Sequence, residues 1–372
     1  MRVALLNPCF WPEVRRGSER FARELGDGLL ARGHSPRLLT SHPGARTDSV
    51  EGGLPVTRLR RPPQDWLVRR AYEDYLTHIP LSYLALERGD DDVAHALYPT
   101  DALAAALWAR HRGRPAVFSY MGTPSLEWLE DRHLRLRIMR RAIRGSDAVV
   151  ALSHTAAAAF HDVFGVEARV IHPGVDLQVF RPLAGEPAPE PTIFCAAAMD
   201  ARSKRVPLLV AAFERVRAER PGARLVLSRP QDPRAAQPLA GAAGAAGSGI
   251  ELRDVDDREA LAAAYAEAWV SALPSLGEAF GLVLLEALAC GTAVVGTRDG
   301  SLPELVNSDA IGRLFDGDDP DALAAALLEA LELAERPDTT SACRSRAEEF
   351  STDRCAADYE ALYAELIEAR AR

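Results

Sequence analysis

Lysine is almost absent from this sequence of 372 residues. Its lysine and arginine residues number 44, and Lys204, in the stretch ARSKRVP at residues 201–207, is the single lysine. The abundance of arginine and alanine is typical of GC-rich coding and by itself indicates no chemistry. A lysine that persists under such a bias is either a chance remnant on the surface or a position where a compact ammonium is needed instead of a planar guanidinium.

Cysteine and long hydrophobic runs are scarce as well. The cysteines are scattered and never form a C-x-x-C pair, which indicates neither a disulfide framework nor a zinc site. They are Cys9, Cys195, Cys290, Cys343 and Cys355. No stretch approaches the roughly 18 apolar residues of a membrane span, and the apolar run in MRVALLNPCF is too short for a secretory signal. We therefore expect a cytoplasmic protein whose cysteines are mostly small core residues.

An excess of positive charge is also lacking. The formal net charge is −9, which argues against a protein whose main work is to grip the phosphate backbone of nucleic acid. One local stretch, HLRLRIMRRAIRG at residues 133–145, is strongly basic. For this stretch we favour a solvated charged helix face over a membrane contact.

The sequence is rich in apolar runs of strand length that alternate with helical patterns. This alternation predicts βαβ units and parallel sheets, and the chain length favours two domains. The first strand is followed by a loop and by a helix from about Ser18, a plausible N-cap. Strands are expected in the first half at residues 2–7, 36–40, 92–97, 115–119, 147–152 and 168–172.

The pattern breaks at RPLAGEPAPEPT, residues 181–192, where prolines and a glycine are typical of an interdomain linker. A second series of strands follows at TIFCAAA, RLVLS, GIELR, AWVSALPS and TAVVGT. Between them, the alanine- and glycine-rich residues 235–249 are typical of a surface loop. We expect two open α/β domains with a cleft between them, at 1–183 and 184–350. A C-terminal helix at 351–372 could pack back on the first domain.

The stretch SLGEAFGLVLLEALACGTAVVGT, residues 275–297, carries the strongest chemical signal. It contains a helix opened by Gly281, and Glu286 is a lone carboxylate among that helix's apolar residues. Glu286 therefore needs a partner within the protein or on a ligand. The free N–H groups at the helix start could receive an anion, and Glu278 lies just before them. Two carboxylates and a phosphate-binding helix start make a socket for a nucleoside diphosphate sugar.

The segment EAFGLVLLE, in which seven residues separate Glu278 from Glu286, is followed by ALACGTAVV and resembles the E-x7-E signature of retaining glycosyltransferases of family 4. The first strand with its glycine loop, VIHPGVDLQVFRP, ALPSLGEAFG and GSLPELV also match in the family's order, across nearly the whole chain. The resemblance implies the α/β GT-B fold, in which two Rossmann-like doubly wound domains face a central cleft. It also implies a retaining hexosyl-type transferase.

The resemblance further implies how the two domains divide the work. The N-terminal domain would bind a small-molecule acceptor, and the C-terminal domain would bind the nucleoside diphosphate sugar. Glu286 would bind the ribose hydroxyls, Glu278 would contact the donor sugar, and Lys204 would neutralise the leaving phosphate. The amides of Leu282 and Val283 would bind the diphosphate, Gly281 would let a phosphate approach closely, and Phe280 would also belong to the donor-binding residues.

Two departures from the family pattern lie in the first domain. Where relatives carry two adjacent glycines, this chain has Arg16-Gly17. Gly17 can still offer amides to the distal phosphate, whereas Arg16 could block that approach, add a charge to it, or be an exposed loop arginine. Met121 stands where relatives often have a histidine before the glycine that is here Gly122. Any role that needs an imidazole is absent, and the backbone carbonyl role survives.

A third departure lies next to the lysine. The family usually has Gly-Arg before the lysine loop, and this chain has AAAMDARSKR instead. Arg202 or Arg205 could replace the missing arginine, and we favour Arg205. Lys204 itself would supply a compact ammonium in a tight diphosphate site, although it could still be an unreplaced surface lysine.

No protein nucleophile emerges from these motifs. The resemblance implies front-face attack, in which the acceptor hydroxyl adds on the side from which the diphosphate leaves, with Lys204, Arg205 and Glu278 as catalytic residues. No D-x-D motif accompanies these residues, so we expect no metal and no other cofactor. The acidic run GDDD at 89–92 is more typical of a turn before a strand. The departures favour a specialised pathway, such as glycosylation of a natural product.

Two other functions remain open. A nucleotide-sugar epimerase of the same fold would need acid and base groups in the cleft, and the E-x7-E element argues against it. A non-catalytic partner subunit is conceivable from Arg16 and Met121. Glu278, Glu286 and Lys204 argue instead for an intact donor site. Transfer or hydrolysis of the donor by the purified protein would separate the partner subunit from the transferase.

Overall fold

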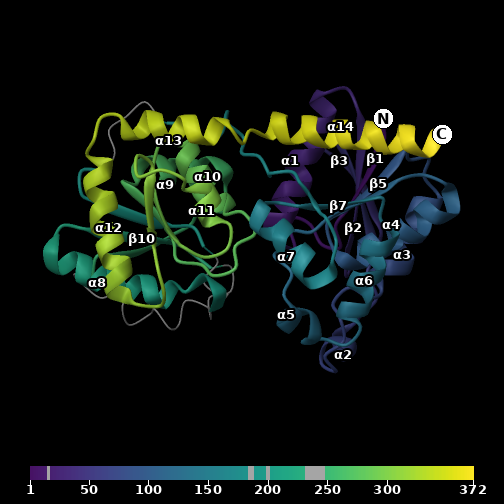
Figure 1. The fold of residues 1–372 in the computed structure, drawn as a ribbon, viewed down its shortest axis with the longest axis horizontal. Coiled ribbons are helices and arrows are strands. Elements are labelled where there is room, and N and C mark those ends of the chain that lie inside the picture. Colours follow the sequence, from purple (N-terminus) through teal and green to yellow (C-terminus); the bar gives the residue numbers. More distant parts are fainter. Residues whose placement is uncertain (15–16, 183–187, 198–201, 231–247) are drawn as a thin grey trace. The chain divides into compact units, whose positions relative to one another are not determined.

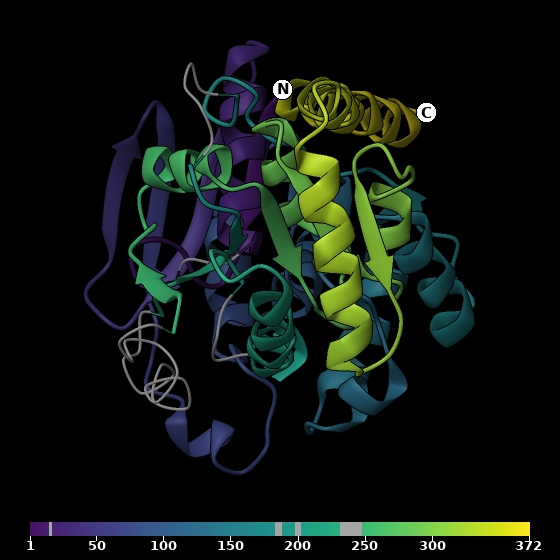
Figure 2. The ribbon, with the colours of Figure 1, turned by 90° about the vertical axis from the view of Figure 1, so that its left-hand side faces the viewer.

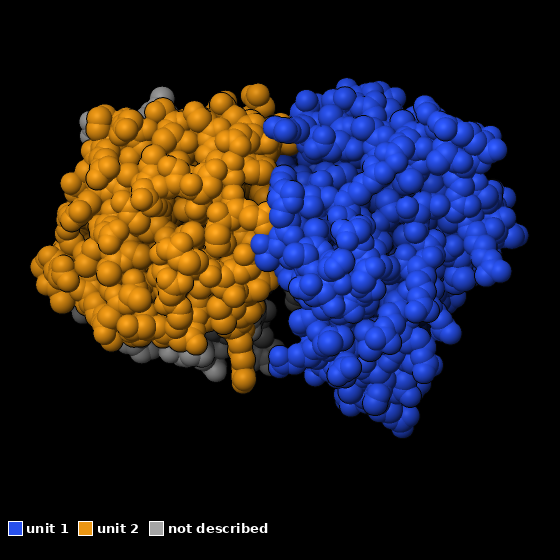
Figure 3. Space-filling view, in the orientation of Figure 1, with its two compact units in different colours: residues 1–174, 352–372 blue, residues 175–351 orange. Residues whose placement is uncertain are grey.

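A computed structural model describes residues 1–14, 17–182, 188–197, 202–230 and 248–372. Arg16, part of the expected linker and nearly all of the expected loop at 235–249 lie outside these ranges. The chain divides into two compact units, coloured in Figure 3: unit 1 is residues 1–174 with 352–372, and unit 2 is residues 175–351. The division falls ahead of the predicted boundary at 183. Val175 N–H donates to the Phe350 carbonyl at 2.8 Å, which joins the segment after Gly174 to unit 2.

Unit 1 is built on a sheet of eight strands in the order β3-β4-β2-β1-β5-β6-β7-β8. Neighbouring strands are parallel except for the antiparallel pair β3 and β4. The strands are β1 (Arg2–Leu6), β2 (Ser35–His42), β3 (Thr47–Glu51), β4 (Leu54–Arg60), β5 (Val93–Ala96), β6 (Ala116–Ser119), β7 (Ala148–Ala151) and β8 (Arg169–Val170). The helices are α1 (Gly17–Ala31), α2 (Asp65–Val68), α3 (His78–Glu87), α4 (Pro99–Arg112), α5 (Leu126–Glu130), α6 (Arg135–Gly145), α7 (His154–Phe164) and α14 (Thr352–Ala371).

Both faces of this sheet are buried. Side chains alternate between the faces of a strand, so Val3 and Leu5 of β1 join an apolar cluster with α1 and α14, as Figure 1 shows for the helices. Ala4 and Leu6 join a second cluster with α3, α4, α6 and α7. A parallel sheet covered on both faces needs strands that are nearly continuously apolar, which is what the sequence supplies.

The C-terminal helix α14 is fixed to unit 1 by a buried polar network as well as by apolar packing. His95 on β5 is hydrogen-bonded to Tyr363 at 2.6 Å and to Ser119 at 2.7 Å. Ser119 is in turn hydrogen-bonded to Tyr359 at 2.8 Å. Burial lowers the pKa of His95 to about 3, so the ring is neutral at physiological pH and α14 closes over it without a buried charge.

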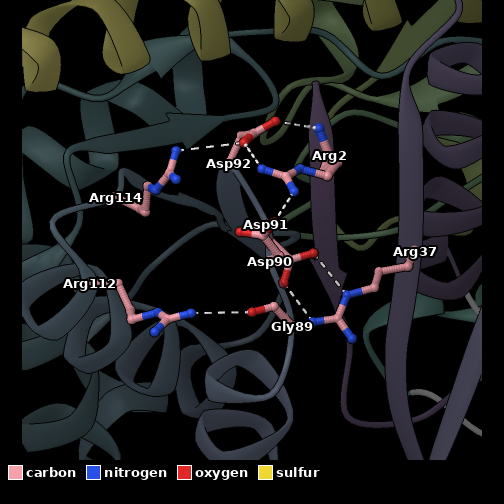
Figure 4. A network of polar contacts seen from close by, with 8 residues as sticks. All are labelled: Arg2, Arg37, Gly89, Asp90, Asp91, Asp92, Arg112 and Arg114. Atoms are coloured by element: carbon pink, nitrogen blue, oxygen red, sulfur yellow. Dashed lines mark hydrogen bonds and ion pairs between the residues drawn. The ribbon is translucent and has the colours of Figure 1, made fainter.

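The acidic run at 89–92 lies at the amino edge of the same sheet, directly before β5 (Figure 4). Arg2 pairs with Asp90 and donates to Asp92 with an N–O distance of 2.8 Å. Arg37 donates to both oxygens of Asp91, at 2.8 and 2.5 Å. The network is completed by Gly89, Arg112 and Arg114. The run therefore forms the turn before a strand, as predicted, and its carboxylates neutralise arginines.

Unit 2 is built on a parallel sheet of six strands in the order β11-β10-β9-β12-β13-β14. The strands are β9 (Thr192–Cys195), β10 (Arg224–Ser228), β11 (Ile250–Arg253), β12 (Val270–Leu273), β13 (Ala293–Thr297) and β14 (Gly312–Phe315). The helices are the 3₁₀ turn η1 (Arg202–Lys204), α8 (Val206–Glu219), α9 (Arg258–Glu267), α10 (Leu282–Ala289), α11 (Leu302–Leu305), α12 (Pro320–Ala334) and α13 (Thr339–Glu348). Figure 2 shows α12 alongside β14, which it contacts.

The predicted α/β architecture is confirmed, and every strand expected from the sequence is present. The β3–β4 hairpin and β14 were not predicted. The residues of β3 are exposed or half-exposed and carry no apolar run that would identify a strand. The helix α1 begins at Gly17, so Ser18 is not its N-cap. Its hydroxyl lies inside the first turn and donates to Glu19 at 3.0 Å. All five cysteines are free and buried, in agreement with core positions.

Candidate functional site

Lys204 and Glu278 meet at the carboxyl edge of the unit 2 sheet, where parallel α/β sheets bind their ligands. Lys204 ends η1, which follows β9, and Glu278 lies between β12 and α10. Their loops are joined by the Leu276 N–H, which donates to the Ser203 carbonyl at 2.9 Å. The Lys204 ammonium donates to the Glu278 carboxylate, and the side chains are 28% and 15% exposed. The single lysine thus forms a half-buried ion pair, which a remnant on the surface would not need.

Glu278 is the only partner of the Lys204 ammonium within the described part of the chain. The cation also lies close to the end of β9. Burial raises the pKa of the Cys195 thiol to about 11, and the charge of Lys204 opposes that rise. Within the described residues, the ammonium of Lys204 therefore makes a single hydrogen-bonded contact, to one carboxylate.

Arg205, by contrast, is used fully by the protein. Its guanidinium donates to the Pro274 carbonyl at 2.6 Å, to the Thr297 hydroxyl at 3.0 Å and to the Gly317 carbonyl at 2.9 Å, and it pairs with Asp318. These acceptors follow or end β12, β13 and β14, so Arg205 ties the ends of three strands together. The sequence favoured Arg205 as a diphosphate ligand, but its guanidinium is directed to these protein acceptors.

The backbone of Arg205 is also unusual. Its φ of +48° places it in the left-handed region, at the N-cap of α8, which is rare for a residue other than glycine. Its guanidinium lies 5.6 Å from the centre of the Phe315 ring, a favourable cation–π distance. These contacts hold the strained residue in place, and the strain sets the direction of the chain right after Lys204.

Arg202 stands at the other end of η1 and has the opposite surroundings. It is exposed, and the described residues offer its guanidinium no hydrogen bond or ion pair. Both arginines were considered from the sequence as the replacement for the family's arginine. Among the described residues, the charge of Arg202 beside Lys204 therefore has no partner.

The helix α10 begins at Leu282, with Gly281 as its N-cap at φ +95° and ψ 46°. A Cβ atom at Gly281 would meet Leu302 Cδ2 at 2.5 Å, so only glycine fits this turn. The Gly281 carbonyl accepts from the N–H groups of Leu284 and Leu285. The preceding amides, those of Leu282 and Val283, have no acceptor within the helix and give its start a positive potential.

The backbone at Glu278 is held firmly next to this helix start. The Glu278 carbonyl accepts from the Ser301 N–H at 3.1 Å and from the Ser301 hydroxyl at 2.9 Å. The Gly277 N–H donates to Asp299 at 2.7 Å. Phe280 is buried and packs edge-on against Phe350, with ring centres 5.3 Å apart. The carboxylate of Glu278 is therefore carried on a fixed backbone.

Glu286 has a partner that sequence reasoning did not identify. It is 2% exposed on α10, and the Tyr265 hydroxyl on α9 donates to its Oε2 at 3.1 Å. Tyr265 is itself fully buried. The apolar neighbours of Glu286 indicated that a donor was needed, but its identity depends on how α9 packs against α10, and no local signal marks Tyr265.

The described residues predicted for the site in unit 1 follow the strands β1 and β6 along the chain. Gly17 is exposed and begins α1. Met121 is half-buried and packs against the cluster beneath α1 and α14. A Cβ atom at Gly122 would lie 3.3 Å from the Tyr120 ring, so this glycine permits a close approach. A further residue here, buried Glu19, accepts from Asn7, Cys9 and Ser18. Its position in the first turn of α1 is the only sequence signal for it.

No group of three or more histidine, cysteine, aspartate or glutamate side chains is placed within the described ranges so as to hold a metal ion. None of the helices in those ranges combines the length and the apolar character that crossing a bilayer requires.

Comparison with known families gives two matches that follow each other along the chain. The model of the family described as "Glycosyltransferase Family 4" matches residues 15–179. The model described as "Glycosyl transferases group 1" matches residues 190–333. The first match lies almost wholly in unit 1, and the second covers all the residues around Lys204, Glu278 and Glu286.

Curated relatives are found in actinobacteria. A D-inositol 3-phosphate glycosyltransferase of Streptomyces coelicolor is 31% identical over 55% of this chain and 51% of the relative, so the chain spans about half the length of that protein. A phosphatidyl-myo-inositol mannosyltransferase of Mycobacterium tuberculosis is 28% identical over 89% of this chain and 86% of the relative.

Solved structures share the arrangement of the elements at low sequence identity. Sucrose-phosphate synthase of Thermosynechococcus elongatus superimposes with a TM-score of 0.81 at 22% identity, over 99% of both chains. The catalytic domain of starch synthase IV of Arabidopsis thaliana gives a TM-score of 0.74 at 17% identity, again over 99% of both chains. At such identities the likeness shows the fold alone.

Proposed function

Because this chain belongs to family 4 of the glycosyltransferases and has their GT-B fold, we propose that it transfers a sugar from a nucleoside diphosphate sugar to a hydroxyl of a small-molecule acceptor, with retention at the anomeric carbon. One observation carries this proposal. The single lysine is paired with Glu278 beside the open amides of α10, at the ligand-binding edge of the unit 2 sheet.

Each part of this arrangement has a task in the proposed reaction. The amides of Leu282 and Val283 receive the diphosphate, because a helix start favours an anion. Lys204 and the uncommitted Arg202 neutralise the charge that develops as the diphosphate leaves. Glu278 accepts hydrogen bonds from the donor sugar. Arg205 acts as a positioning residue that joins the strand ends beneath them.

The ribose site and the direction of attack complete the proposal. Glu286 receives the ribose hydroxyls, and Tyr265 fixes the orientation of its carboxylate. Because no side chain of the site is placed as a nucleophile by its motif, the acceptor hydroxyl attacks from the face that the diphosphate leaves. A diphosphate oxygen then accepts its proton. Gly17, Met121 and Gly122 are assigned to the distal phosphate and the donor sugar.

The names of the relatives guide the choice of acceptor. The two relatives described above act on inositol 3-phosphate and on phosphatidyl-myo-inositol by name. We therefore place cyclitols and their phosphates first in an acceptor screen and hydroxylated natural products second. The five free, buried thiols are typical of a reducing compartment, which supports a cytoplasmic location. Cations of the protein serve the diphosphate, so turnover should persist in EDTA.

The first experiment is the change in melting temperature with UDP, GDP, ADP and dTDP in turn, because a ligand of the folded protein stabilises it by mass action. One nucleotide should stabilise the protein clearly more than the others. The matching sugar nucleotides are then incubated with the acceptors, and the anomeric configuration of the product is read by NMR. Stabilisation by none of them, together with no donor turnover, would contradict the transferase and favour a non-catalytic partner subunit.

A further inference from the structure

We propose that the Lys204–Glu278 ion pair is exchanged when the donor binds, and that this exchange makes the site prefer the sugar-bearing nucleotide over the free nucleoside diphosphate. The inference rests on the proposed function and deepens it, because it assigns a specificity to two residues of the same site. The exchange distinguishes the substrate, a nucleoside diphosphate sugar, from the product, a nucleoside diphosphate that shares most of its atoms.

The pair is built so that it can be exchanged. Lys204 makes one charged contact, with Glu278, within the described residues, and both side chains are only partly buried. Arg205, one residue further, makes contacts with four protein groups and cannot be released by losing one of them. A lysine ammonium on a flexible stem can turn from one anion to another, whereas a bound guanidinium fork cannot.

The charges around the pair set the preference. When Lys204 is neutralised by Glu278, the site presents less positive charge to a diphosphate. If Lys204 turns to the diphosphate while no sugar is present, Glu278 loses its donor and becomes an unpaired carboxylate near another anion, and like charges disfavour that state. A donor sugar removes this conflict, because its hydroxyls donate to Glu278 and replace the ammonium.

The backbone around the pair is rigid, so the exchange involves side chains only. The Glu278 carbonyl is held by Ser301, and the backbone of Gly300 lies so close that a Cβ there would meet the Glu278 oxygen at 2.8 Å. The backbone bond from Leu276 to Ser203 keeps the two loops together. Because the loops are fixed, the Lys204–Glu278 ion pair forms again once the sugar has been transferred. This weakens the binding of the nucleoside diphosphate and favours its release.

The test is the affinity of the full-length protein for each nucleotide with and without its sugar, measured by calorimetry at low salt. The probes are the nucleoside diphosphate that stabilises the wild type most, among UDP, GDP, ADP and dTDP, and the same nucleotide bearing a hexose. The variants are Glu278→Gln and, as a control for the loss of any carboxylate at this edge, Asp316→Asn, whose side chain is 75% exposed and pairs with Arg298. Melting temperatures verify that both variants are folded.

We expect Glu278→Gln to bind the free nucleoside diphosphate about tenfold more tightly, the size expected when one partly exposed charge is released. Its affinity for the sugar nucleotide should fall, and Asp316→Asn should change neither value. A Glu278→Gln variant that binds the free diphosphate no better than the wild type would overturn the inference. If that happens in a protein that still binds and transfers the sugar, the proposed function survives. A wild type that binds none of UDP, GDP, ADP and dTDP, with or without the sugar, fails both the inference and the proposed function.

Discussion

The amino edge of the unit 1 sheet and the carboxyl edge of the unit 2 sheet both concentrate charge, and they use it differently. At the amino edge, three consecutive carboxylates are matched by arginines, and Arg37 and Arg2 each make several bonds (Figure 4). At the carboxyl edge, one lysine meets one glutamate. The first arrangement closes a turn before a strand, and the second holds one ammonium by one carboxylate, which the proposed exchange requires.

In this arginine-rich chain, the side chains that fix the fold differ in kind from the side chain proposed to bind the ligand. A guanidinium makes several directed bonds at once and suits a place that must stay fixed. Arg205 shows the same behaviour within the candidate site, where it joins the ends of three strands. An ammonium with one contact suits a place where the partner must change. This contrast accounts for the single lysine better than chance retention on the surface does.

The largest expected effect is on turnover. Lys204→Ala should lower the rate by about 100- to 1000-fold, because it removes one donor that stabilises the developing charge of the leaving diphosphate. Lys204→Arg is the matched control, and it should recover only part of the loss, since it keeps the charge but not the compact shape. Steady-state kinetics with the identified donor give both values. Turnover of Lys204→Ala within a few-fold of wild type would refute the role of the lysine.

Substitution of Arg205 should affect stability, whereas substitution of Arg202 should affect nucleotide binding. Arg205→Ala leaves several polar acceptors without their donor and should lower the free energy of unfolding by about 1–3 kcal/mol. Arg202→Ala should leave the unfolding midpoint unchanged and weaken nucleotide binding by less than about tenfold, as expected for an exposed charge. Urea unfolding and calorimetry on both variants measure this pair of effects. If instead Arg205→Ala weakens nucleotide binding and Arg202→Ala lowers stability, Arg205 is the diphosphate ligand, as the sequence predicted.

The smallest effect is expected at the amino edge. Hydrogen bonding from Arg2 holds the pKa of Asp92 below its ordinary value, so the pair contributes stability above pH 4 that is lost as the pH falls through the lowered pKa. Because Arg2 is exposed, Asp92→Asn should cost no more than about 1 kcal/mol at pH 7. The difference in unfolding free energy from wild type should shrink as the pH falls from 7 to 3. Urea unfolding at pH 7 and at pH 3 tests both statements, and a larger or pH-independent cost would argue against them.

The fold and the local structure of much of the candidate site could be predicted because their signals are local. Gly281, the apolar run of α10 and the spacing of the two glutamates all lie within one short stretch, and the helix begins directly after Gly281, as the pattern predicted. The buried strands were recognisable as apolar runs. The β3–β4 hairpin was not, because β3 is largely exposed and its residues are polar.

What escaped prediction depends on contacts between segments that are distant in the sequence. Tyr265 reaches Glu286 from another helix. The several bonds of Arg205 come from the ends of strands 69 and more residues away. Nothing in the stretch ARSKRVP distinguishes the arginine that is used internally from the one that is not. The assignment of Arg205 to the diphosphate therefore remains a prediction, and the contacts in the structure favour Arg202.

Whether Lys204 changes its partner when the donor binds can be tested directly, because Lys204 is the only side-chain amine in the chain. Reductive methylation with ¹³C-formaldehyde labels Lys204 and the α-amino group of Met1 and keeps both cationic, and Lys204→Arg identifies the two NMR signals. We expect the chemical shift of the Lys204 signal to change and reach saturation with the sugar nucleotide, and to change less with the free nucleoside diphosphate. An unchanged Lys204 chemical shift, under conditions in which the sugar nucleotide raises the melting temperature, would contradict the proposed exchange of the Lys204–Glu278 ion pair.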